Sequence, residues 1–396
     1  MVNEKREVKK EDEPANLVRS KNQLLLKKQM NRKKEIRIEA KRFLEDPALL
    51  YRIYSAQGDV QGEDENKILL PVLNFAKQSF EVQGETAAGK NTIVDSALSL
   101  FPKNWWKKIT GLSDRSVRYL GESLRTLYLA ERRAMRTGEE STAEYDIKLV
   151  ISEGKLRVLV TVSDPKSPKK FKAKEFKTQI ENVVLTSTEL VVPQELQNRI
   201  WVVRVDDSKD QNIRVRDKKL ADAERLPSEK PDLTRDKKII QTAFAIVDKE
   251  APEDVIVPYA TLLKALLDEK ETRVRRDTDK LISLIRGITR LFYRQRTTIL
   301  DKNDKVLVSG PEDFWIAWRI GATAIKETFT DKTERDVRIL KCCKQLADNE
   351  KEISAKTLVE LTGKSDATCQ KYLRALQVKG FLTEEARGPH GLNAIL

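Results

Sequence analysis

The chain has 396 residues, a formal net charge of +13 and a pI near 9.4. This length exceeds what a single hydrophobic core usually supports, so several domains are expected. The excess of Lys and Arg favours a polyanionic partner, with nucleic acid as the first candidate and an anionic membrane surface as the second.

Two classes of protein do not fit this composition. The three cysteines (Cys342, Cys343 and Cys369) have no C-x-x-C spacing and His390 is the only histidine, so a zinc-binding domain would lack ligands. No apolar run approaches the roughly 20 residues of a membrane span, and the N-terminus is too charged for a signal peptide. We therefore expect a cytoplasmic protein with reduced thiols and no membrane partner.

The chain begins with a segment in which charged residues outnumber apolar ones. Residues 1–45 predict a basic, partly disordered stretch that ends in a helix. A solvated tail is the simpler interpretation of this segment, and a nucleic-acid-binding arm is the alternative. Two helical patterns follow, in DPALLYRIYSAQG and DENKILLPVLNFAKQ, and the alternating stretch SFEVQ predicts the first strand.

A glycine-rich stretch, GETAAGKNT, follows that strand and precedes a helical pattern that ends at Pro102. Strand, loop and helix come in the order of the phosphate-binding loop G-x-x-x-x-G-K-[ST], so ATP and Mg²⁺ are the predicted cofactors. Backbone amides would hold the β-phosphate at the helix N-terminus, and Lys90 would contact the β and γ oxygens. The predicted nucleotide-binding residues are Gly84, Glu85, Thr86, Ala87, Ala88, Gly89, Lys90, Asn91 and Thr92.

One position of this loop departs from the pattern. Asn91 stands where a hydroxyl usually binds the magnesium ion, and an amide oxygen suits that octahedral site less well. Thr92 does not replace it, because the next helical position points about 100° away. Slow hydrolysis, or a metal held through water, is therefore expected.

Three further apolar runs complete a predicted α/β sheet within residues 46–215. LRTLYLAE, NVVLTSTE and RIWVVRVD read as strands separated by helical patterns, which favours a largely parallel sheet covered on both faces. Glu131 ends the first of these runs, where a carboxylate can orient an attacking water. Between the first two runs, KLRVLVTVSDPKSPKKFKAKEFKTQ predicts a β-hairpin with lysines at its tip.

The rest of the chain has helical patterns. Residues 237–332 predict a helical lid or linker domain, in which DTDKLISLIRGITRLFYRQR is the clearest amphipathic helix. Residues 333–396 predict three helices and a small strand region in the order of a winged helix-turn-helix. Lys364, Lys371 and Arg374 would contact the DNA backbone there, although winged helices also dock onto proteins.

In this order the motifs resemble the ATPase and C-terminal portion of the primase-helicase proteins of bacterial and archaeal mobile elements, an AAA+ family. The resemblance covers most of the chain after residue 45. It is carried by GEDENKILLPVL, GETAAGKNTIVDSALSLFP, LTSTELVVPQELQNR, RVRRDTDKLISLIRGITRLFYRQR and the winged-helix pattern. It implies an AAA+ P-loop core with an inserted hairpin, and a separate primase as a possible partner.

The resemblance also implies roles for single residues. With Lys90, the catalytic set would comprise Glu131, Thr186 as a polar sensor of the γ-phosphate and Arg199 as an arginine finger for the neighbouring subunit, which implies a homo-oligomer, expected as a hexameric ring. Asn91 and Glu131 would hold the metal, although Ala130 stands where an aspartate usually helps. The hairpin lysines Lys166, Lys169 and Lys170 would hold single-stranded DNA in the pore.

Three functions follow as hypotheses. The first is an ATP-dependent DNA helicase, translocase or replication ATPase of a mobile element. The second is a DNA-binding replication initiator or regulator with a degenerate site that binds ATP and barely hydrolyses it. The third is a scaffold ATPase that binds no DNA and whose winged helix docks onto proteins. The role of Trp105 and Trp106 is left open, since paired tryptophans can stack on bases or pack in a core.

Overall fold

The structure is a computed structural model of the whole chain. It describes residues 15–113, 115–120, 123–131, 142–163, 171–189, 194–229, 231–266, 274–330, 334–349, 351–378 and 381–382. The hairpin-tip residues Lys166, Lys169 and Lys170 lie outside these ranges, as does the strand region predicted after residue 382.

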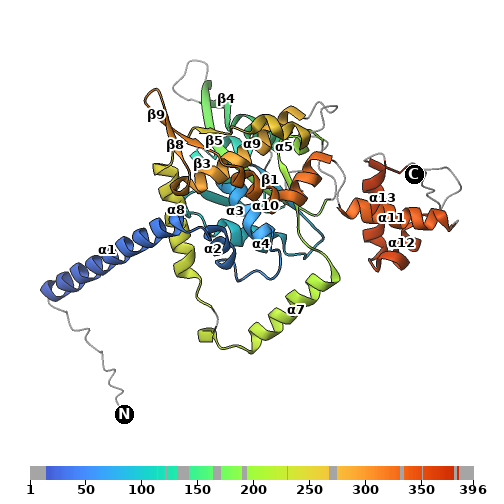
Figure 1. Cartoon of the computed structure of the whole chain (residues 1–396), viewed down its shortest axis with the longest axis horizontal. Helices are drawn as coiled ribbons and strands as arrows, with labels where there is room; N and C mark the ends of the chain where they lie inside the picture. Colours follow the sequence, from blue (N-terminus) through green and yellow to red (C-terminus); the bar gives the residue numbers. More distant parts are fainter. Residues whose placement is uncertain are drawn as a thin grey trace, which may run out of the picture.

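The centre of the structure is a six-stranded sheet in which the strand order is β2-β3-β5-β1-β6, with β4 paired to β5 (Figure 1). Neighbours along this path run parallel, and β4 runs antiparallel to β5. The fold is therefore α/β with a parallel sheet, as the sequence predicts. The strands are β1 (Phe80–Gln83), β2 (Trp106–Ile109), β3 (Ser123–Leu129), β4 (Lys155–Ser163), β5 (Phe171–Ser187) and β6 (Trp201–Arg204).

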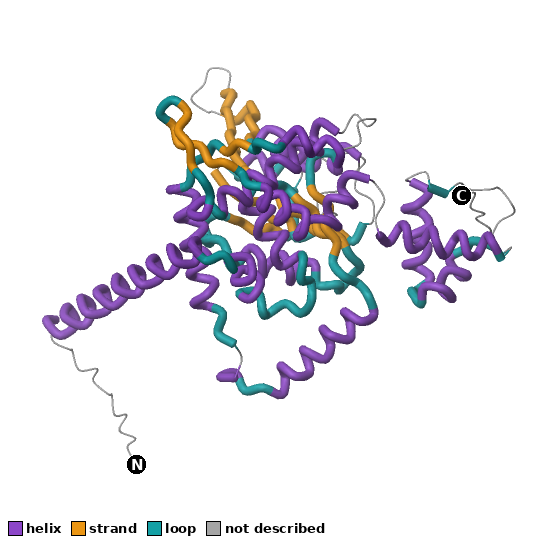
Figure 2. The backbone as a smooth tube through the Cα atoms, in the orientation of Figure 1, coloured by secondary structure: helices purple, strands orange, loops and turns teal. Residues whose placement is uncertain are grey.

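Alternate residues of the strands face two separate hydrophobic cores. Val82 and Val184 belong to the larger core, which also contains residues of the helices α3, α4, α8 and α9. Leu127 and Val183 belong to the smaller core, with residues of α5 and α6. Helices therefore cover both faces of the sheet, which is why its strands read as nearly continuous apolar runs. Figure 2 shows the strands enclosed between helices.

The helices of the α/β part join and flank these strands. They are α1 (Ala15–Glu45), α2 (Leu49–Ser55), α3 (Asn66–Phe75), α4 (Lys90–Leu98), α5 (Thr142–Glu153), α6 (Gln194–Gln197) and α7 (Lys209–Glu224). The helix α7 is absent from the expectations above, because its residues are so polar that no apolar face marks it. Ser208 begins it as an N-cap that accepts a hydrogen bond from the Gln211 amide.

The region predicted to be helical between residues 237 and 332 holds a second sheet as well as helices. The helices are α8 (Thr234–Glu250), α9 (Val274–Leu291) and α10 (Pro311–Thr330), and the strands are β7 (Val255–Ile256), β8 (Thr298–Asp301) and β9 (Asp304–Val308). The expected helices are present, and the small sheet was not predicted. β8 and β9 form a hairpin, and their β-branched residues on either side of a polar turn were the available signal.

Three helices end the described chain: α11 (Glu334–Asp348), α12 (Ala355–Thr362) and α13 (Asp366–Val378). Ser354 and Thr357 form a capping box at the start of α12, and Gly363 ends that helix with a positive φ of 65°. These features set the short turn between α12 and α13. The apolar faces of the three helices pack together in a small core around Cys343, Cys369 and Leu373. None of the helices described here is both long and apolar enough to cross a bilayer.

Candidate functional site

The glycine-rich loop joins the end of β1 to the start of α4, as the sequence predicts. A Cβ added at Gly84 would lie 2.3 Å from Cγ2 of Val205, so only glycine lets β1 approach the end of β6 so closely. Gly89 has a φ of +85°, which favours glycine for its conformation rather than for space. The loop geometry therefore depends on both glycines of the motif.

Lys90 is the first residue of α4, and its side chain turns back into the loop. Its Nζ donates hydrogen bonds to the carbonyl oxygens of Gly84 (3.2 Å) and Glu85 (2.7 Å). Burial lowers the pKa of Lys90, while the charges of Glu131 and Glu85 act in the opposite direction. The ammonium group is thus held at the loop by weak carbonyl partners that an anion can replace.

Glu131 and Thr186 lie at the same edge of the sheet as this loop. The register pairs Val82 with Thr186 and Leu129 with Leu185, so the carboxyl ends of β1, β5 and β3 meet there. Oε1 of Glu131 is buried and has no hydrogen-bond partner within the described part of the chain. Burying a carboxylate oxygen without a hydrogen-bond partner costs free energy. Such unpaired oxygens are found at catalytic sites.

Asn91 connects the loop to both neighbouring strands. Its Oδ1 accepts hydrogen bonds from the hydroxyl of Tyr128 (2.9 Å) and from that of Thr186 (3.0 Å). Thr186 also contacts the carbonyl of Ala130, and burial raises the pKa of Tyr128. The amide oxygen expected to replace the usual metal-binding hydroxyl is therefore already engaged by two protein hydroxyls.

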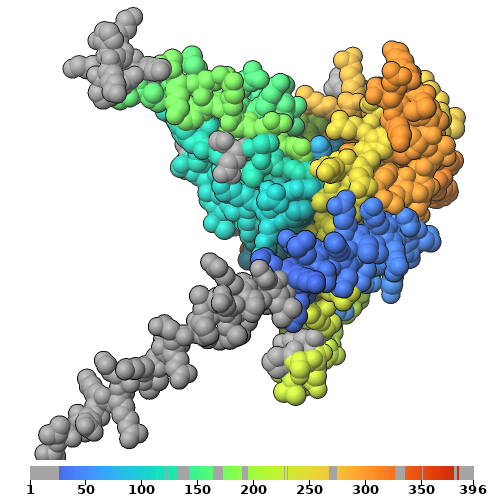
Figure 3. All heavy atoms as spheres, turned by 90° about the vertical axis from the view of Figure 1, so that its left-hand side faces the viewer, coloured from blue at the N-terminus to red at the C-terminus, as the bar shows by residue number. Residues whose placement is uncertain are grey.

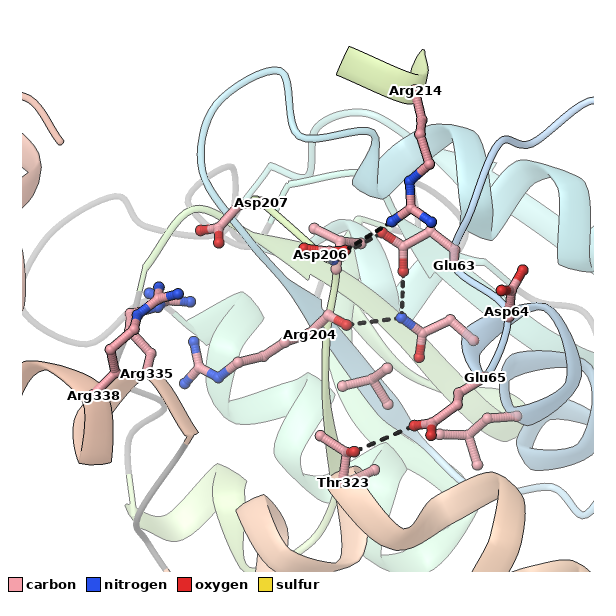
Figure 4. A pocket seen from close by; sticks show the side chains of 15 residues that line it. Glu63, Asp64, Glu65, Arg204, Asp206, Asp207, Arg214, Thr323, Arg335 and Arg338 are labelled. Carbon is pink, nitrogen blue, oxygen red and sulfur yellow. Dashed lines mark hydrogen bonds and ion pairs between the residues drawn. The ribbon is translucent and has the colours of Figure 1, made fainter. Parts of the chain in front are cut away.

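A cavity of about 590 Å³ lies at the end of β6, and one of its lining residues, Val205, also lies against Gly84 of the loop. Glu63 and Asn66 form one wall: Asn66 donates to Glu63 (2.6 Å) and to the Arg204 carbonyl (2.7 Å). Burial raises the pKa of Glu63, partly offset by hydrogen bonds from Asn66 and the Asp206 amide. On the opposite side, Figure 4 shows the guanidinium groups of Arg204, Arg335 and Arg338 close together.

The C-terminal helices contact the loop next to this cavity. The hydroxyl of Tyr372 on α13 donates to Oε1 of Glu85 at 2.7 Å. Nζ of Lys364 lies 3.8 Å from the same carboxylate oxygen and donates to the Asp207 carbonyl at 3.1 Å. Arg335 lies over the ring of Tyr372, 5.1 Å from its centre. A chain of contacts thus runs from the cavity through α13 to the loop.

Other predicted residues are distributed away from the loop. Arg199 precedes β6 at the amino edge of the sheet, where Nη1 donates to the Lys148 carbonyl at 3.1 Å and contacts Ser152. It is therefore not brought to the loop of its own chain. Lys371 and Arg374 are exposed on α13, whereas Lys364 is engaged at the loop.

Several residues of this region were assigned no functional role from the sequence. Asn66, Glu63 and Arg335 line the cavity, and Tyr128 and Tyr372 contact the loop. The acidic run GEDEN just before α3 was the one available signal. Arg275 and Arg276, from the stretch RVRRD that carries part of the resemblance, are exposed at the start of α9 and do not line the cavity.

The comparisons with known proteins add no family to this geometry. No protein-family model matches the chain, and no curated protein matches it. Among the residues described, no group of three or more His, Cys, Asp or Glu side chains could hold a metal ion.

Proposed function

We propose that the chain is an ATP-dependent DNA helicase or translocase, or a replication ATPase of this kind, with an AAA+ P-loop core and a C-terminal winged helix-turn-helix. The observation that carries the proposal is the meeting of Lys90, Glu131 and Thr186 at the edge of the sheet from which the glycine-rich loop leaves β1. A positive side chain, a buried carboxylate and a hydroxyl are the groups that phosphoryl transfer to water requires.

In this proposal each residue has a defined task. Lys90 leaves the carbonyls of Gly84 and Glu85 to bind the β and γ oxygens, and the amides of the loop hold the β-phosphate. Glu131 orients the attacking water, and Thr186 contacts the γ-phosphate. The neighbouring cavity takes the rest of the nucleotide. Bound Mg²⁺ would offset phosphate charge; Glu131 fits it as a ligand, and Asn91 fits once its oxygen is released from Tyr128 and Thr186.

The position of Arg199 supports an oligomer. It lies at the amino edge of the sheet, away from the loop of its own chain, which suits a residue that completes the site of a neighbour. A ring would bring the hairpin of β4 and β5 toward a central DNA strand. The exposed cations of α13 are a second surface for DNA.

ATP turnover with and without single-stranded DNA tests this function. We expect turnover to rise several-fold with DNA, because the moving hairpins and the nucleotide site share β5. The mass of the protein in solution, measured with and without nucleotide, reports ring formation. Turnover that is absent under all these conditions, despite measurable ATP binding, would contradict a motor.

The second candidate, an initiator or regulator that binds ATP and barely hydrolyses it, is favoured by one observation. Asn91 Oδ1 is held by Tyr128 and Thr186, which leaves the metal without its usual hydroxyl ligand. Replacing it by a hydroxyl, Asn91→Thr, is expected to raise Mg²⁺-dependent turnover about tenfold, by restoring the usual ligand. Steady-state turnover against Mg²⁺ concentration measures this.

The matched control is Asn212→Thr, the same substitution at an exposed position of α7. It should leave turnover unchanged, because that residue is not part of the loop. If Asn91→Thr lowers turnover instead, the asparagine contributes to the site as it stands and the degenerate-site candidate loses its support.

A further inference from the structure

A basic groove lies on a side of the protein that no predicted site uses. It has a volume of about 1000 Å³ and runs between α1, α8 and the segment that joins α4 to β2. Figure 3 shows the face on which α1 (blue) meets the body of the protein. Seven Lys or Arg residues and one Glu line the groove: Lys28, Arg32, Lys33, Lys103, Arg235, Lys237, Lys238 and Glu35.

The walls of this basic groove are fixed in place by contacts with the core. Phe43 and Leu44 of α1 are fully buried, and Gln295 donates to the Leu44 carbonyl at 3.0 Å. Gln241 of α8 donates to the Ser99 carbonyl at 2.9 Å, which joins α8 to the segment after α4. The groove is therefore built by the fold.

Most of the charge in the basic groove lacks an acidic partner. Arg235 pairs with Glu39 at 2.5 Å and Lys237 with Asp59 at 3.3 Å. No ion pair within the described ranges involves the remaining cations, of which Arg32 acts electrostatically on Asp232; they are Lys28, Arg32, Lys33, Lys103 and Lys238. Cations that converge on a groove without acidic partners repel one another, so an anion bound there relieves the repulsion.

The shape and lining of the basic groove select among anions. Trp106 of β2 lines it with a half-buried ring that also packs against the larger core, and an unstacked base can lie on the accessible part of such a ring. Amide side chains at Gln29, Asn31 and Gln241 add hydrogen-bonding groups. A flat membrane surface does not enter a groove with walls on both sides. The volume of the groove is at the upper limit of typical small-molecule pockets, which favours a larger ligand.

We propose that this groove binds the sugar-phosphate backbone of single-stranded nucleic acid, with a base stacked on Trp106. The inference deepens the proposed function and rests on it only for the identity of the strand as DNA. None of its lining residues belongs to β4, β5 or α13, so it is a contact surface for the strand in addition to those two. Its contacts are electrostatic and tolerate any sequence.

The test is binding of fluorescein-labelled (dT)20 to the full chain, by fluorescence anisotropy without nucleotide over a range of salt concentrations. The variant Arg32→Ala/Lys103→Ala/Lys238→Ala removes one free cation from each wall. The logarithm of the binding constant falls linearly with the logarithm of the salt concentration, and each lost phosphate contact reduces the steepness of this slope by about 0.7. The slope should therefore become shallower by about 2 in the triple variant. Its affinity at 0.1 M salt should fall on the order of 100-fold. Anionic vesicles and polyglutamate serve as competitors.

The control variant Lys219→Ala/Lys249→Ala/Lys305→Ala removes the same charge from exposed positions outside the groove. It should change affinity less than about threefold, because its residues contact no phosphate. Equal loss in the two variants, no loss in either, or stronger binding of polyglutamate or vesicles than of DNA would overturn the proposal. Binding of a fluorescent ATP analogue, measured in parallel, reports the loop separately, so failure there would count against the proposed function and leave the groove standing.

Discussion

Replacing Lys90 by alanine is expected to reduce ATP turnover by at least about 100-fold. Among the residues that the structure describes, the Lys90 ammonium donates hydrogen bonds to the carbonyls of Gly84 and Glu85. A hydrogen bond to a charged group contributes about 1.5–3 kcal/mol, so ATP affinity should weaken about 10- to 100-fold when the phosphates lose this donor. Loss of charge stabilisation in the transition state reduces turnover further.

The matched control is Lys305→Ala, an exposed lysine on β9. It removes the same charge from a position far from the loop and should leave turnover and ATP affinity within twofold of the parent. The melting temperature of both variants checks that they remain folded. Unchanged turnover in Lys90→Ala would rule out the loop as the phosphate site, whatever the fate of the DNA-binding surfaces.

The parallel sheet and the loop were predictable because their signals are local and repeated. Strands buried on both faces read as apolar runs, and glycines at both ends of the loop mark the turn between strand and helix. The reason for glycine at position 84, in contrast, is not visible in the sequence. A Cβ there would lie 2.3 Å from Val205, a residue distant in sequence.

Residues that reach the site from other parts of the fold were not predictable. Tyr128 and Tyr372 read as core residues, and both are indeed buried, but each directs its hydroxyl to the loop. The charged side chain of Arg335 is buried as well and lines the cavity. Such roles depend on which elements pack together, and periodicity along one element contains no information about its partner.

The surroundings of Trp105 and Trp106 differ in ways that only the structure shows. The guanidinium of Arg125 lies 3.8 Å from the centre of the Trp105 ring, whereas Trp106 is on β2 at the edge of the sheet and lines the basic groove. Both rings are half-buried and pack against the larger core, so core packing accounts for both. The sequence left packing and base stacking open as roles for this pair, and base stacking at Trp106 is part of the proposal for the groove.

Replacing Glu131 by glutamine is expected to lower turnover on the order of 100-fold or more while ATP still binds. Oε1 of Glu131 is buried without a hydrogen-bond partner in the described chain, and its charge acts on Lys90. Glutamine keeps the size and removes the negative charge that accepts a proton from water, a contribution of about 100- to 10,000-fold in general base catalysis. ATP affinity should stay constant or improve, because a charge that repels the phosphates is lost.

Single-turnover hydrolysis and equilibrium binding of ATP measure the two effects separately. Glu153→Gln, at an exposed position where α5 ends, removes the same charge and should alter neither quantity. The split between binding and hydrolysis is what separates Glu131 from Lys90, since the lysine variant is expected to lose both. A Glu131→Gln protein that hydrolyses ATP at the parent rate would show that this carboxylate is an ordinary strand end, and the attacking water would then need another base.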